Sequence, residues 1–100
     1  MTDPGRRLRV AVIGVGHLGK FHARIYRENP RAELVAVVDP NLERARELAG
    51  ELGCLALESA AELPAELDAV SIAVPTALHA RVAIPLLERG IPCLIEKPLA

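Results

Sequence analysis

A glycine-rich turn between two apolar runs is the feature that most constrains the fold of this chain. Residues 10–13 are apolar, and residues 14–19 then follow the spacing G-x-G-x-x-G before a helical pattern begins. A second apolar run, residues 34–38, ends in Asp39, about 20 residues after the last glycine of the turn. Strand, glycine turn, helix, strand and acidic residue in this order are typical of a dinucleotide-binding βαβ unit.

Each glycine of the turn has a distinct expected role. Gly14 permits the tight turn off the strand, Gly16 lets the backbone approach a pyrophosphate, and Gly19 lets the helix pack closely. The backbone N–H groups of His17, Leu18 and Gly19 open the helix and would face the phosphates together with the positive end of the helix dipole.

Asp39 is expected to choose the cofactor. A carboxylate at the end of the second strand accepts hydrogen bonds from both hydroxyls of an adenosine ribose, and its charge repels a 2′-phosphate, so NAD is expected and NADP is less favoured. Arg44 is the nearest downstream cation and would soften this preference. The alternative is that Asp39 only starts a turn and caps the next helix.

The alternation of strands and helices predicts one α/β domain over residues 1–100. The three most continuous apolar runs indicate parallel strands that are covered on both faces. The expected fold is a doubly wound, mostly parallel Rossmann sheet, with strand order 3-2-1-4 around the switch point. The five expected strands are residues 9–13, 33–38, 54–57, 69–74 and 92–96.

Local signals predict where the helices begin and end. Asn29-Pro30 should stop the first helix, Asn41 should cap the second and Gly53 should end it. Residues 59–62 read as a capping box, and the last helix should run from Thr76 to Gly90 with a kink at Pro85. The apolar face expected for the first helix comprises Leu18, Phe21, His22, Ile25 and Tyr26.

Composition narrows the class of protein. Hydrophobic residues make up 51% of the chain, aromatic residues only 2%, and the net charge is −1, so nothing points to a nucleic-acid or membrane surface. No apolar stretch is long enough for a membrane span. Cys54 and Cys93 lack a CxxC spacing and are expected to be reduced thiols in a cytoplasmic protein. No metal-ligand spacing is evident.

Further candidate site residues follow the later strands, because ligands bind at the carboxyl ends of the strands in such sheets. Pro75 and Thr76 follow the fourth strand, and Glu96 and Lys97 follow the fifth. A lysine there can place an ammonium beside a reacting hydroxyl, although a surface charge pair before a turn proline explains the same residues. His79 either lies near the cofactor or only caps the first turn of its helix.

Together these residues resemble the glucose–fructose oxidoreductase / inositol dehydrogenase (Gfo/Idh/MocA) family from about Arg9 to the end of the chain. The matching segments are residues 14–22, Asp39, residues 74–79 and residues 96–98. The resemblance implies oxidation or reduction of a secondary alcohol on a sugar, cyclitol or sugar nucleotide with NAD or NADP. It also implies that Lys97 binds the reacting hydroxyl and that Pro75 and Thr76 line the nicotinamide side. A cis Lys97–Pro98 bond would aim the lysine into the cleft.

Family members continue into a second α/β domain that binds substrate and forms oligomers, so the chain is expected to be the N-terminal part of a longer enzyme. Residues 1–100 alone are then expected to be inactive, and the full-length enzyme to be a homo-oligomer. Two other classes remain open: a non-catalytic NAD-sensing regulatory module and an S-adenosylmethionine-dependent methyltransferase. Lys97 favours catalysis over sensing, and a methyltransferase gives no reason for residues 96–98.

Overall fold

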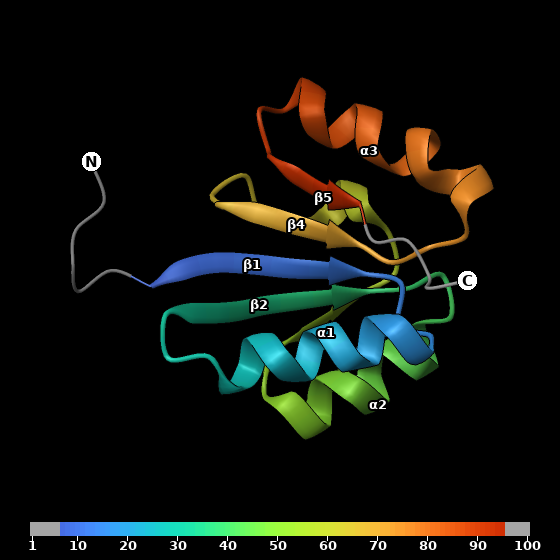
Figure 1. Ribbon diagram of the computed structural model, residues 1–100. Helices are drawn as coiled ribbons and strands as arrows, with labels where there is room; N and C mark the ends of the chain where they lie inside the picture. The colour runs from blue at the N-terminus through green and yellow to red at the C-terminus, as the bar shows by residue number, and fades with distance from the viewer. Residues whose placement is uncertain (1–6, 96–100) are drawn as a thin grey trace.

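The chain folds into a single parallel sheet with helices on both faces (Figure 1). The structure is a computed structural model that describes residues 7–95. Its strands are β1 (Leu8–Ile13), β2 (Ala32–Val38), β3 (Leu55–Leu57), β4 (Ala69–Ile72) and β5 (Cys93–Ile95). Its helices are α1 (His17–Glu28), α2 (Leu42–Leu52) and α3 (His79–Glu88), with two 3₁₀ turns, η1 (Ala60–Glu62) and η2 (Thr76–Leu78).

The strand order is β3-β2-β1-β4-β5, and all pairs are parallel. The predicted doubly wound topology is therefore confirmed. Strands β2 and β3 follow one another on one side of β1, and β4 and β5 follow one another on its other side. The switch point lies between β1 and β4, where the loops that follow these two strands diverge and leave a crevice.

Side chains of β1 alternate between two hydrophobic cores, one on each face of the sheet. Val10 and Val12 pack in the core beneath α1 and α2, and Ala11 and Ile13 pack in the core beneath α3. Figure 1 shows α1 and α2 together on one side of the sheet and α3 on the other. Burial on both faces explains why residues 10–13 of this strand are continuously apolar.

The predicted end of the first helix, both predicted ends of the second and the predicted capping box are confirmed. Asn29 ends α1, and Gly53 ends α2 in the left-handed conformation with φ of 72°. The Asn41 side chain accepts a hydrogen bond from the backbone N–H of Arg44 at 3.2 Å and so caps α2. Ser59 and Glu62 form the expected reciprocal capping box around η1.

The segment after β4 differs from the prediction at its start. Thr76 begins a 3₁₀ turn, and the α-helix starts only at His79. As predicted, Pro85 lies inside this helix, which continues to Glu88. Arg81 and Pro85 are both exposed, so water can solvate the Arg81 carbonyl that loses its helical partner.

The face of α1 that packs on the sheet also differs from the prediction. Gly19 and Ala23 are buried, whereas Phe21 and Ile25 are 58% and 44% exposed. Tyr26 does pack against the core, and its hydroxyl lies 2.6 Å from Oγ of the buried Ser71. Close contact between Gly19 and the β1 loop fixes the rotation of the helix, and this contact outweighs the larger side chains.

Candidate dinucleotide site

Loops at the carboxyl ends of β1, β2 and β4 enclose a crevice of about 390 Å³ at the switch point. Four of the predicted site residues line it, namely Gly14, Gly16, Asp39 and Pro75. The rest of the lining is Pro40, Asn41, Arg44, Ala73, Val74 and Leu78. Parallel strands deliver these loops to one edge of the sheet, so residues distant in sequence meet there.

Gly14 is required by the backbone itself. Its φ of 94° lies in the region that favours glycine, and a Cβ there would stand 2.5 Å from the carbonyl oxygen of Ala73. The Gly14 N–H donates to the carbonyl of Val38 at 2.7 Å. This glycine therefore turns the chain tightly while its N–H stays hydrogen-bonded to the end of β2.

Gly19 and Gly16 differ in the space that a side chain would have at each position. A Cβ at Gly19 would collide with the carbonyl oxygen of Gly14, so the first turn of α1 can lie against the β1 loop only with a glycine at position 19. A Cβ at Gly16 would meet no protein atom within 4 Å. The fold alone does not require glycine at position 16, and the open space beside it suits the close approach of a phosphate group to the backbone.

Helix α1 begins directly after Gly16. The first helical hydrogen bond runs from the N–H of Lys20 to the carbonyl of Gly16 at 2.9 Å. The N–H groups of His17, Leu18 and Gly19 precede it and have no partner within the helix. Backbone donors and a positive dipole end thus lie beside Gly16, as anion binding requires.

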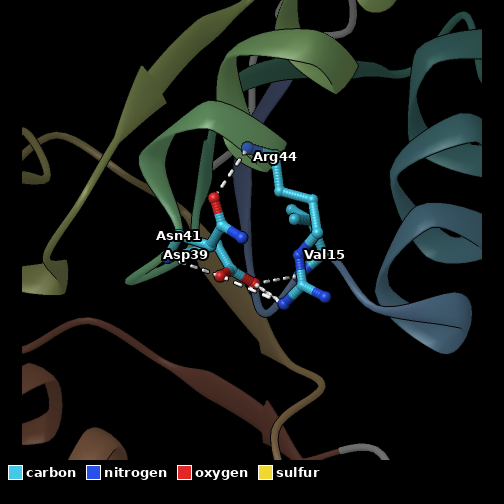
Figure 2. Close-up of polar contacts among 4 residues, drawn as sticks. All are labelled: Val15, Asp39, Asn41 and Arg44. Atoms are coloured by element: carbon cyan, nitrogen blue, oxygen red, sulfur yellow. Dashed lines mark hydrogen bonds and ion pairs between the residues drawn. The ribbon is translucent and has the colours of Figure 1, made fainter.

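Asp39 joins the loops after β1 and β2 (Figure 2). Its Oδ2 accepts the N–H of Val15 at 2.9 Å, and its Oδ1 accepts the N–H of Asn41 at 2.8 Å. Only 5% of the side chain is exposed. The alternative role, starting a turn, is thus also present, because Asp39 holds the turn that leads into α2 while it lines the crevice.

Arg44 pairs with the same carboxylate from the first turn of α2. One terminal guanidinium nitrogen lies 3.2 Å from each oxygen of Asp39, and 49% of the Arg44 side chain is exposed. Figure 2 shows the arginine reaching over the carboxylate from α2 toward the β1 loop. The sequence identified Arg44 as a nearby cation, and the structure brings it into direct contact.

The other predicted site residues lie farther along the loop after β4 or outside the described part. Thr76 is exposed at the start of η2, and Nε2 of the buried His79 lies 2.9 Å from the carbonyl oxygen of Val74. His79 thereby fixes the loop that carries Val74 and Pro75 along the crevice. Glu96, Lys97 and the Lys97–Pro98 bond lie outside the described residues.

A larger apolar hollow adjoins the crevice and was not predicted from the sequence. It measures about 470 Å³ and shares Pro40, Val74 and Leu78 with the crevice. Val82, one helical turn beyond Leu78, also lines it. The spacing of these two apolar residues along the predicted helix was the available signal.

Between residues 7 and 95, no helix is long and apolar enough to cross a membrane, and no cluster of His, Cys, Asp or Glu side chains is suited to a metal ion.

Both cysteines are free and half-buried, and burial raises the pKa of the Cys54 and Cys93 thiols. Burial therefore lowers the fraction of each thiol that is present as the nucleophilic thiolate.

This fold and this crevice define a dinucleotide-binding Rossmann domain. A family model described as an oxidoreductase family with an NAD-binding Rossmann fold matches residues 8–100. The chain belongs to this family, Gfo/Idh/MocA, which confirms the resemblance drawn from the glycine turn and the later motifs.

Relatives and solved structures agree with this assignment. A UDP-N-acetylglucosamine 3-dehydrogenase from Acidithiobacillus ferrooxidans is 52% identical over 91 residues, which are 91% of this chain and 28% of that protein. A structure of this enzyme from the same organism matches with a TM-score of 0.84 and 51% identity, over 92% of this chain and 30% of its own.

A scyllo-inositol dehydrogenase from Lactobacillus casei, solved with bound NAD(H) and scyllo-inositol, matches with a TM-score of 0.83 and 27% identity. The match covers 93% of this chain and 28% of that one. The chain thus spans less than a third of the length of each of these relatives.

Proposed function

We propose that this chain is the cofactor-binding part of an oxidoreductase that transfers a hydride between NAD and a secondary alcohol. The substrate class is a sugar, a cyclitol or a sugar nucleotide. One observation carries the proposal: Gly16 and Asp39 line the same crevice, and the fold alone does not require a glycine at position 16. The names of the relatives supply the substrate class.

The proposed binding mode uses both the crevice and the apolar hollow beside it. The pyrophosphate would lie on Gly16 and the first N–H groups of α1, and the adenosine ribose on Asp39. The apolar hollow beside Pro40 and Leu78 suits the adenine ring. Pro75, Thr76, His79 and Glu96 are the residues proposed to border the nicotinamide.

Lys97 is the proposed catalytic residue. Bound NAD would supply a hydride acceptor. The ammonium of Lys97 would donate a hydrogen bond to the reacting oxygen and stabilise the negative charge that develops there, while the hydroxyl proton would pass to an acid–base residue elsewhere in the complete enzyme. The complete enzyme is proposed to be a cytoplasmic homo-oligomer whose substrate residues lie beyond residue 100.

A two-part assay of the complete protein tests this function. Isothermal titration should show NAD⁺ binding, and NADH absorbance should rise when UDP-N-acetylglucosamine, myo-inositol or scyllo-inositol is added as a candidate alcohol. Binding without turnover on any sugar, cyclitol or sugar nucleotide would favour the regulatory module. Absence of dinucleotide binding would contradict the proposal entirely.

A further inference from the structure

The carboxylate of Asp39 has no acceptor position left for a ligand in this structure. A carboxylate offers about four lone-pair positions, two on each oxygen. On each oxygen of Asp39, one position takes a backbone N–H, from Asn41 or Val15, and another faces the same nitrogen of Arg44. A ribose diol that donates to both oxygens must therefore displace a present contact.

Only the Arg44 contact is readily displaced. The two backbone contacts hold the turns after β1 and β2 and lie next to a carboxylate that is 95% buried. Arg44 reaches the carboxylate with a long side chain that is half exposed, and water can solvate its guanidinium once it leaves. A single nitrogen equidistant from both oxygens also occupies the place where a vicinal diol would donate its two hydrogen bonds (Figure 2).

We propose that in the unliganded protein Arg44 occupies the position on Asp39 that the ribose diol takes when NAD binds. We further propose that Arg44, once released from Asp39, binds the 2′-phosphate of NADP. This inference rests on the proposed dinucleotide function. NAD displaces Arg44 from Asp39. NADP brings a phosphate beside the displaced guanidinium, whose planar donors suit a phosphate group.

Asp39 and Arg44 then set the cofactor preference as a pair with opposing effects. The Asp39 charge repels a 2′-phosphate, while Arg44 attracts it. Arg44 also competes with the ribose of NAD for the carboxylate, so it opposes NAD binding slightly. Removal of Arg44 alone should therefore widen the preference for NAD, and removal of the Asp39 charge alone should free Arg44 to bind NADP.

The main experiment compares Arg44→Ala with Arg46→Ala in the complete protein. Arg46 is an exposed cation on the same helix and does not line the crevice, so it controls for loss of one positive charge. Dissociation constants for NAD⁺ and NADP⁺ are measured by calorimetry at low and moderate salt. Arg44→Ala should weaken NADP⁺ binding by roughly ten-fold or more, the usual effect of a charge-assisted hydrogen bond. The same variant should leave NAD⁺ affinity equal or higher.

Arg46→Ala should change both constants by less than about two-fold, as expected for an exposed charge. Equal weakening of NAD⁺ and NADP⁺ by Arg44→Ala would overturn the inference, since Arg44 would then be a general anion contact. Unchanged NADP⁺ binding would overturn it too.

A second pair of variants covers the case in which NADP⁺ binds the wild type too weakly to measure. Asp39→Asn keeps the size of the side chain and should raise NADP⁺ affinity, and Asp39→Asn with Arg44→Ala should lose this gain. A gain that persists in the double variant contradicts the role of Arg44 but leaves the proposed function intact. A wild-type protein that binds neither dinucleotide contradicts both.

Discussion

The first turn of α1 rests on the backbone of the β1 loop, with Gly19 directly against the carbonyl oxygen of Gly14. No side chain fits between them. The contact sets both the rotation of α1 and the position of its N-terminal N–H groups beside the crevice. One glycine pair thus couples helix packing to the geometry of the anion site.

This contact predicts a large loss of stability for Gly19→Ala. The added methyl would meet backbone, which cannot move aside as a flexible side chain would, so the free energy of unfolding should fall by about 3 kcal/mol, the upper end of the usual cost of overpacking. Gly50→Ala is the matched control, because Gly50 lies inside α2 with nothing within 4 Å of its Cβ position. That variant should be more stable than wild type by about 0.5–1 kcal/mol. Urea denaturation of both variants gives the comparison, and equal stabilities would contradict the contact.

Gly16→Val should separate binding from folding. Its Cβ position is open and its φ of −69° suits any residue, so the variant should keep the circular dichroism spectrum and melting transition of wild type. Dinucleotide affinity should become undetectable by titration, because the side chain fills the space that a pyrophosphate would take. Undiminished NAD⁺ binding would show that the glycine has no role in the site.

The Tyr26–Ser71 hydrogen bond should contribute measurably to stability. Tyr26→Phe removes one partner and leaves the hydroxyl of Ser71, which is 2% exposed, without the bond of 2.6 Å. The expected cost is about 1–3 kcal/mol in the free energy of unfolding. In the Ser71→Ala background the same substitution should cost less, since no hydroxyl remains to be satisfied. Equal costs in the two backgrounds would mean that the hydroxyls are not coupled.

Cys54 should react slowly with alkylating reagents in the native state. Burial raises the pKa of its thiol, so the thiolate fraction at neutral pH is lower than in the unfolded chain. The rate of iodoacetamide labelling, followed by peptide mass spectrometry, should rise when the protein is unfolded in urea. The labelling rate should also rise with pH, and the midpoint of this rise should lie at a higher pH in the native protein than in the unfolded chain. A fast-labelling native Cys54 would contradict the effect of burial.

Lys97→Ala should reduce kcat in the complete enzyme by roughly 10²–10⁴, the range for a positioned proton-transfer group. NADH affinity should change little, because other residues are proposed to hold the phosphates and the adenosine ribose. Lys97→Arg should not restore turnover, since a guanidinium has a different geometry and does not release its proton. Steady-state kinetics with a sugar nucleotide or cyclitol, together with NADH titration, separates the two effects. Near-normal turnover of Lys97→Ala would remove the lysine from the mechanism.

The sequence by itself determined the elements and their order. Helix caps and stops depend on residues within one turn of each other, so Asn41, Gly53 and the Ser59–Glu62 box could be identified without a structure. The continuous apolar runs likewise indicated parallel strands, and the strand order followed from the rules for such sheets.

Only the tertiary structure decided which side chains meet across those elements. The Gly14–Gly19 contact turned α1 so that Ala23 and Tyr26 face the sheet and Phe21 faces solvent, although the apolar pattern alone favoured the larger residues. The same holds for Arg44, whose contact with Asp39 depends on where the Asn41 cap starts α2 above the β1 loop. Such contacts depend on helix rotation and on the distance between segments, and spacing along the chain specifies neither.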